Sequence, residues 1–143
     1  MSKDTITQLA IFIENRTGRL AEICRTLGEN GINIFGFSVA DTEGYGIFRL
    51  ICKRPQIVHQ VLKDVGFTVR ESEVLCLRVP HRPGGLADAL SLFSKAEINV
   101  EYMYAIADTL IIFNLDNITK AVEIAQREGI EIVRQDDFPL QNF

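Results

Sequence analysis

The sequence predicts an α+β fold made of two ferredoxin-like units with the order β-α-β-β-α-β, each an antiparallel four-stranded sheet with two helices. Three observations predict it: an internal repeat, the hydrophobic periodicity within each copy, and the turn residues between elements. The expected domains are residues 1–73 and residues 74–143, the second ending in a short tail. At 143 residues and 47% hydrophobic content, the chain is long enough to form both cores.

The repeat becomes visible when the sequence is displaced by 66 residues. Residues 15–21, Asn-Arg-Thr-Gly-Arg-Leu-Ala, then align with residues 81–87, His-Arg-Pro-Gly-Gly-Leu-Ala. The same displacement aligns residues 32–34, Ile-Asn-Ile, with residues 98–100, Ile-Asn-Val. After a deletion of three residues the displacement becomes 63, and the apolar pattern continues to the end of each copy. Two copies in register predict two similar domains that form a pseudo-symmetric pair.

The first half of each copy predicts a strand, a helix and a second strand. An alternating run rich in β-branched residues over residues 7–13 predicts the first strand. Gly31 ends the helix that follows, because glycine readily adopts the left-handed conformation that closes helices. Residues 32–39 predict the second strand. The helix itself is predicted by apolar residues at helical spacing, namely Leu20, Ile23, Cys24 and Leu27.

The second half of each copy predicts a hairpin, a helix and a last strand. Residues 41–44, Asp-Thr-Glu-Gly, are typical of a hairpin turn, and residues 46–52 predict the strand after it. Apolar residues recur at helical spacing between residues 57 and 65. Gly66 ends this helix, and residues 67–71 predict the fourth strand. The second copy repeats the same order.

The predicted strands carry large apolar residues on both faces, although helices are expected to cover only one face of each sheet. Ile11 and Phe12, for example, point in opposite directions. Each large side chain left in water would forgo roughly 1.5–3 kcal/mol of burial. We therefore expect the helix-free face to pack on the other copy or on a second chain. A homo-oligomer, most simply a homodimer, is the expected assembly.

Charge and composition exclude several classes of function. The net charge is −4 and neither half of the chain is basic, which argues against nucleic acids and anionic membranes as partners. No apolar run approaches the ~18 residues of a membrane span, and the first residues do not resemble a secretory signal, so a cytoplasmic protein is expected. The cysteines, at positions 24, 52 and 76, lack paired spacing, so we expect no disulfide framework, no metal and no cofactor.

The candidate binding site is the loop between the first strand and the first helix of each copy. Gly18 and Gly84 allow the backbone to approach a ligand closely. The free N–H groups at a helix start, with the positive end of the helix dipole, suit a carboxylate. Asn15 adds a donor and an acceptor, and Pro83 suits a helix start. A purely structural interpretation stays open, in which these residues only cap the helix and turn the chain.

Both loops resemble the ligand loop of the ACT domain, which typically reads Asp/Asn-x-Pro-Gly-x-Leu. Here residues 15–20 read Asn-Arg-Thr-Gly-Arg-Leu and residues 81–86 read His-Arg-Pro-Gly-Gly-Leu. Each is followed by a helix and then by Gly-Ile-Asn-Ile or Glu-Ile-Asn-Val, which resembles the start of the family's second strand. The resemblance covers nearly the whole chain, twice, and is closest to the small stand-alone tandem ACT proteins of prokaryotes. Thr17 and His81 depart from the family's usual residues.

The resemblance implies a regulatory or sensor protein without catalytic activity, which binds a free amino acid where two ACT units meet. It also implies that the protein regulates a metabolic enzyme allosterically and that this enzyme is its partner. The loop that contains Asn15 is the preferred site, because it retains the amide. The residues that the resemblance assigns to the ligand come from the two loops and the two second strands: Asn15, Arg16, Thr17, Gly18, Arg19, Leu20, Asn33, Ile34, His81, Arg82, Pro83, Gly84, Gly85, Leu86, Asn99 and Val100.

Three alternatives remain. The same topology serves RNA-binding domains, and residues 43–50 resemble their RNP1 pattern, but Glu43 replaces the leading basic residue and the second copy lacks the pattern. Acylphosphatase-like enzymes share the fold and use a loop arginine with an asparagine elsewhere in the sheet. Arg16 or Arg19 with Asn33 or Asn99 would serve as that pair, but the family's phosphate-binding loop sequence is absent. An ACT-fold assembly module that binds no small molecule is the third alternative, since both loops depart from the family pattern.

Overall fold

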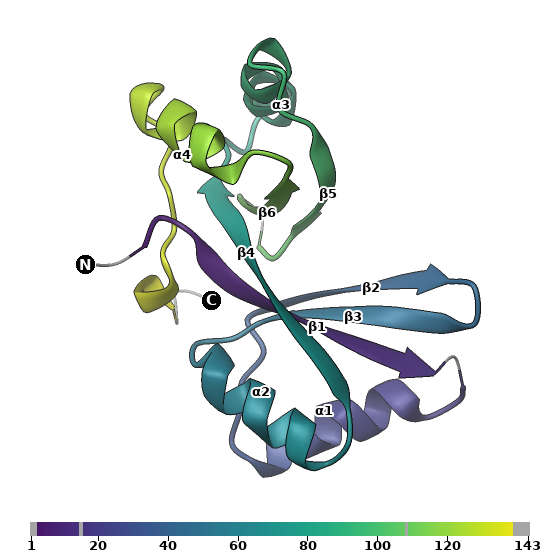
Figure 1. The fold of residues 1–143 in the computed structure, drawn as a ribbon. Helices are drawn as coiled ribbons and strands as arrows, with labels where there is room; N and C mark the ends of the chain where they lie inside the picture. The colour runs from purple at the N-terminus through teal and green to yellow at the C-terminus, as the bar shows by residue number, and fades with distance from the viewer. Residues whose placement is uncertain (1–2, 15, 108, 139–143) are drawn as a thin grey trace. The chain divides into compact units, whose positions relative to one another are not determined.

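The computed structural model describes residues 3–14, 16–107 and 109–138 (Figure 1). The chain divides into two compact units. The N-terminal unit spans Thr7–Ser72, and the C-terminal unit contains the residues up to Ile6 and those from Glu73 onward. Both are α+β units of the ferredoxin-like type, which confirms the predicted fold class.

The N-terminal unit has the strand order β2-β3-β1-β4. Strand β3 pairs antiparallel with both β1 and β2. Helices α1 and α2 lie on the same side of these strands (Figure 1). The elements are β1 (Ile6–Glu14), α1 (Arg19–Glu29), β2 (Gly36–Thr42), β3 (Tyr45–Ile51), α2 (Pro55–Asp64) and β4 (Thr68–Arg78).

The C-terminal unit repeats this arrangement with a shorter sheet. The second half of β4 pairs antiparallel with β6, and β6 pairs with β5. Where the repeat predicts a fourth strand, the described residues form an isolated bridge between Leu77 and Ile132. The remaining elements are α3 (Gly85–Lys95), β5 (Val100–Ala105), β6 (Leu110–Leu115), α4 (Ile118–Arg127) and the 3-10 helix η1 (Gln135–Asp137). The predicted tail from residue 139 onward lies outside the described residues.

Two predicted boundaries are wrong. Strand β4 runs without a break through Ser72 and Glu73, because that segment contains no glycine or proline to interrupt a strand. The second strand begins at Gly36 rather than at residue 32. Gly36 pairs with Ile51, the last residue of β3, and the ladder ends there with the Phe35 N–H donating to the Ile51 carbonyl at 2.9 Å.

Each unit has its own apolar core, built from the helix faces and strand positions that the periodicity predicts. In the N-terminal unit, the core side of the sheet packs on both helices through Leu9, Ile11, Phe48, Leu50, Ile23, Leu27, Val58 and Leu62. In the C-terminal unit, Phe93 of α3 meets Phe113 of β6 edge to face, with ring centroids 5.4 Å apart. These apolar contacts position the loops that precede α1 and α3.

The edge strand β2 exposes large apolar side chains on the helix side of its sheet. Phe37 is 60% exposed and Val39 is 49% exposed. They pair across the ladder with the core residues Leu50 and Phe48, so they share the face that carries the helices. Met103, which the repeat aligns with Phe37, is exposed in β5. A surface of this kind on an edge strand is typical of a contact region.

Candidate functional site

The loops before α1 and α3 adopt the same backbone conformation. Gly18 has φ 86° and ψ −7°, and Gly84 has φ 83° and ψ −7°. Both glycines are in the left-handed region, where a side chain would be strained. Each is the N-cap of its helix, and its carbonyl accepts from the residue four positions on, at 3.0 Å from Glu22 and 2.9 Å from Asp88.

The turn before each glycine is also repeated. The Arg16 N–H donates to the Glu14 carbonyl at 2.9 Å, and the Arg82 N–H donates to the Pro80 carbonyl at 3.0 Å. The internal repeat is thus conserved in hydrogen bonding as well as in sequence. In both loops the N-cap is a glycine, which supplies no side-chain acceptor to its helix.

Each helix start offers backbone donors that nothing in the described chain accepts. The N–H groups of Leu20 and Ala21 in α1, and of Leu86 and Ala87 in α3, have no acceptor among the described residues. Such orphan donors combine with the positive end of the helix dipole. Two neighbouring N–H groups fit the two oxygens of a carboxylate.

A pocket of about 410 Å³ opens at the first loop, and we call it the loop pocket. It gathers the loop residues with two strands of the same unit: Ile13, Glu14, Arg16, Thr17, Gly18, Arg19, Leu20, Ala21, Val39, Asp41 and Gly46. Arg16 is held by Glu14 at 3.3 Å, whereas the Asp41 carboxylate has no hydrogen-bond or ion-pair partner in the described part of the chain. The pocket therefore presents free amide donors and a free carboxylate to one ligand.

Asp41, Val39 and Gly46 were missed by the sequence prediction. Asp41 and Gly46 face each other in the register of β2 and β3. That register brings the end of the hairpin to the loop, which lies more than twenty residues earlier in the chain. The predicted turn at residues 41–44 was the only sequence signal, and it indicated a turn rather than a binding group.

Arg19 forms one wall of the loop pocket. Its guanidinium carbon lies 4.4 Å from the centroid of the Phe67 ring, and its Nη1 donates to Glu22 at 3.0 Å. The side chain is only 18% exposed, and its Nε is buried without a hydrogen-bond partner among the described atoms. Arg19 also lines a second pocket, of about 260 Å³, on the side of Phe67.

Replacing Arg19 with alanine should lower the free energy of unfolding by about 1–2 kcal/mol, because the change removes a cation-π contact and the packing of the alkyl chain. Arg16→Ala is the matched control, since its ion pair with Glu14 is exposed on both sides and is worth about 0–1 kcal/mol. Urea denaturation of both variants measures the difference. Equal losses in the two variants would contradict the structural role assigned to Arg19.

The second loop differs from the first in the residue at the position of Arg19. Gly85 occupies the place of Arg19, and a Cβ there would lie 2.1 Å from the Pro80 carbonyl oxygen. The Gly85 N–H donates to the Arg82 carbonyl at 2.9 Å, whereas the equivalent bond from Arg19 is longer, at 3.3 Å. The second loop is therefore tighter and has no side chain at the position of Arg19. The Arg82 guanidinium turns instead to Asp88, at 2.9 Å.

Within a unit, the structure does not bring the predicted strand residues to the loop. Asn33 lines a separate pocket beyond the far end of α1, and Ile34 packs against the core. Asn99 and Val100 line a pocket of about 430 Å³ beyond the end of α3. Asn15 lies outside the described residues. A role for Asn33 or Asn99 beside a loop would require a neighbouring unit, as the resemblance implies.

Among the described residues, no three side chains of His, Cys, Asp or Glu come together to hold a metal ion. Among the helices that the structure describes, none is both long enough and apolar enough to span a bilayer.

The whole chain is similar to proteins of known structure. A protein from Bacteroides thetaiotaomicron is 30% identical, with a TM-score of 0.88, and the match covers 93% of this chain and 94% of that one. The regulatory subunits of aspartate kinase from Thermus thermophilus and Thermus flavus are each 14% identical, with TM-scores of 0.64 and 0.61. Each match covers 85% of this chain, and 91% and 90% of the respective subunits, and shows the shared fold.

A family model for the ACT domain pair matches residues 4–140. None of the curated proteins matches the chain in sequence. The matched range includes both loops, both helix starts and all six strands. The chain therefore belongs to the family of ACT domain pairs.

Proposed function

We propose that the chain binds a free amino acid in the loop pocket and acts as a regulatory module. The observation that carries the proposal is the pairing of the orphan amides of Leu20 and Ala21 with the unpartnered carboxylate of Asp41 in one pocket. A zwitterion matches this pairing, with its carboxylate at the amides and its ammonium group at Asp41. Asn15, three residues before Gly18 in the sequence, is proposed to offer its side-chain amide to the same ligand.

The side chain of the ligand meets apolar surface in this arrangement. Leu20 and Val39 both line the pocket and both are exposed. A second copy of the chain, or another ACT unit, would cover the pocket and bury the ligand between the two surfaces. Such burial is what a ligand of about nine heavy atoms needs to reach micromolar affinity.

A homodimer fits this function. The edge strand β2 carries exposed Phe37 and Val39 and has no proline, lysine or bulge to prevent pairing with another chain. We propose that a second copy covers this edge and that ligand binding shifts the packing there. The target would be a metabolic enzyme that responds to the amino acid. The two Thermus proteins of similar fold are named as regulatory subunits of aspartate kinase.

The test is a thermal-shift screen of the protein against the twenty amino acids at millimolar concentration. A ligand present at 100 times its dissociation constant stabilises the folded protein by about 2.7 kcal/mol, which is a rise of roughly 5–10 °C in Tm for a chain of this size. We expect such a shift for one chemical group of amino acids.

Variants locate the site. Asn15→Ala should weaken the ligand at least tenfold, while Asn30→Ala, at the other end of α1, should leave its affinity unchanged. Unchanged affinity in Asn15→Ala would place the ligand elsewhere. If no amino acid shifts the Tm of a cooperatively melting protein, the exposed edge of β2 favours the second candidate, an assembly module that binds no small molecule.

A further inference from the structure

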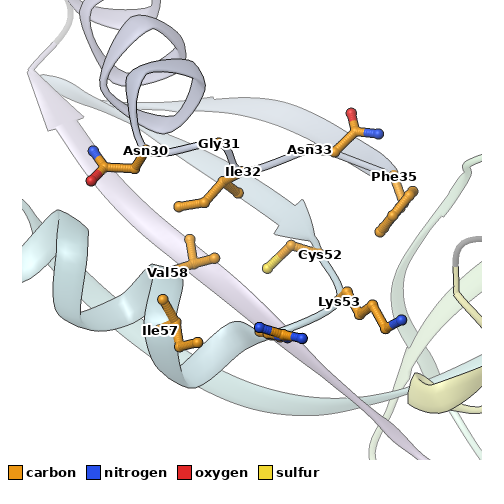
Figure 2. Close-up of a pocket in the computed structure, with 10 residues that line it drawn as sticks. Asn30, Gly31, Ile32, Asn33, Phe35, Cys52, Lys53, Ile57 and Val58 are labelled. Carbon is orange, nitrogen blue, oxygen red and sulfur yellow. The ribbon is translucent and has the colours of Figure 1, made fainter.

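A further pocket, of about 310 Å³, lies in the N-terminal unit, beyond the end of α1 that is remote from the loop (Figure 2). We call it the Lys53 pocket. In Figure 2, Ile32, Cys52 and Val58 face one another from the segment after α1, the end of β3 and helix α2. Their apolar side chains form the interior. A pocket of this volume is at the lower end of the range for small-molecule sites.

The polar part of the Lys53 pocket is cationic. Lys53 and Arg54 both line it, and neither side chain forms an ion pair or hydrogen bond with any described residue. No aspartate or glutamate lines the pocket. Asn33 also lines it, and its backbone N–H has no acceptor in the described chain. Two unpaired cations and a free donor therefore surround an apolar interior.

The start of α2 contributes further free donors to the same pocket. Arg54 is the N-cap of α2, and its guanidinium, which has only donors, cannot cap the helix. Pro55 begins the helix, and the first backbone bond runs from the Val58 N–H to the Arg54 carbonyl at 3.2 Å. The backbone amides of Gln56 and Ile57 thus have no acceptor among the described residues; Ile57 lines the pocket, and Gln56 precedes it in the first turn of the helix.

The C-terminal unit has different residues at the equivalent positions. The repeat aligns Lys53 with Asp116 and Asn33 with Asn99. There, Asp116 Oδ1 accepts from the Asn99 N–H at 3.0 Å, so the unit supplies its own carboxylate to the donor. Asn117, which aligns with Arg54, caps α4 by accepting from the Lys120 N–H at 3.2 Å.

The N-terminal unit has the same backbone donors but replaces both acceptors with cations. An internal carboxylate is absent where the repeat has one, and two positive charges stand in its place. An external carboxylate satisfies the donors and the cations together. The comparison of the two copies is a separate observation, which does not rely on the free amides at the start of α2 or on the presence of a pocket.

We propose that the Lys53 pocket binds a small organic carboxylate with an apolar body. The carboxylate lies between Lys53, Arg54 and the Asn33 N–H, and the apolar body packs on Ile32 and Val58. The absence of any acidic lining residue disfavours an ammonium group, so the ligand is a plain or 2-oxo acid rather than an amino acid. The site is separate from the loop pocket and does not depend on the function proposed for it.

Three probes with one carbon skeleton test the ligand class by titration of ¹⁵N-labelled protein: 4-methylpentanoate, its neutral amide 4-methylpentanamide, and leucine. We expect 4-methylpentanoate to shift the amide resonances of Asn33, Gln56 and Ile57, and both other probes to bind there at least tenfold more weakly. Equal binding of the amide, or tighter binding of leucine in this pocket, would overturn the proposal. Shifts with inorganic phosphate but not with 4-methylpentanoate would also overturn it.

A variant that restores the residues of the C-terminal unit tests the mechanism. K53D/R54N should lose 4-methylpentanoate binding at least tenfold and should raise Tm, because it supplies an internal carboxylate and a helix cap. Lys63→Gln, which removes a charge from α2 outside the pocket, should bind normally. If K53D/R54N does not fold, K53Q/R54Q removes the cations alone and should show the same loss. Retained binding in the folded double variant would refute the site.

Discussion

Raising the pH from 9 to 11 should lower the free energy of unfolding by about 4–5 kcal/mol through two buried thiols. Cys52 and Cys76, one in each unit, are 1% and 0% exposed. Burial raises the pKa of each thiol from an ordinary 9.0 to about 12. Above pH 9 the unfolded chain therefore loses two protons that the folded chain retains.

The sign of the effect follows from this proton balance. Because the folded state binds more protons, stability falls as the pH rises, by about 1.4 kcal/mol per pH unit for each thiol. The stabilisation is fully present below pH 9 and disappears towards pH 12. Urea denaturation at several pH values measures the slope. The double variant C52A/C76A should have a flatter slope, and an unchanged slope in that variant would show that the thiols are not its cause.

Gly85→Ala should lower the free energy of unfolding by roughly 2 kcal/mol or more, an effect reserved for strained or clashing sites. The added Cβ would lie 2.1 Å from the Pro80 carbonyl oxygen, which is backbone and cannot rotate away. Relief of the clash requires the second loop to open, so the first turn of α3 should also lose protection against hydrogen exchange.

Gly28→Ala is the matched control for this substitution. Gly28 lies within α1, and a Cβ there meets nothing within 4 Å. Alanine at this position should stabilise the protein by about 0.5–1 kcal/mol, because it lowers the backbone entropy of the unfolded chain. Opposite signs for the two variants in chemical denaturation are expected. Two changes of the same sign and size would contradict the tight geometry of the second loop.

Much of the fold was predictable because the repeat and the periodicity are local properties of the sequence. The helix ends at Gly31 and Gly66 and the hairpin near Gly44 follow from left-handed glycines, and all three have positive φ. Strand boundaries were less predictable, since they depend on where a partner strand ends. Gly36 begins β2 only because β3 ends at Ile51.

The candidate site was predictable only in part. The loop residues from Arg16 to Leu20 were identified from the repeat, and the structure brings them together. Asp41 was missed, because strand register rather than sequence proximity places it beside the loop. The difference in polar partners between the pockets beyond α1 and α3 could not be predicted from the sequence. The hydrogen bond from the Asn99 N–H to Asp116 joins residues 17 positions apart.

The central claim is that a free amino acid binds with its carboxylate at the start of α1. The most direct test is a ¹⁵N titration with the amino acid that gives the largest shift in Tm, following every backbone amide. We predict the largest changes at Leu20 and Ala21, with smaller changes near Asp41, and their loss in Asn15→Ala. Saturable binding that leaves the amides of α1 and α3 unmoved, with its largest changes elsewhere in the chain, would contradict the account.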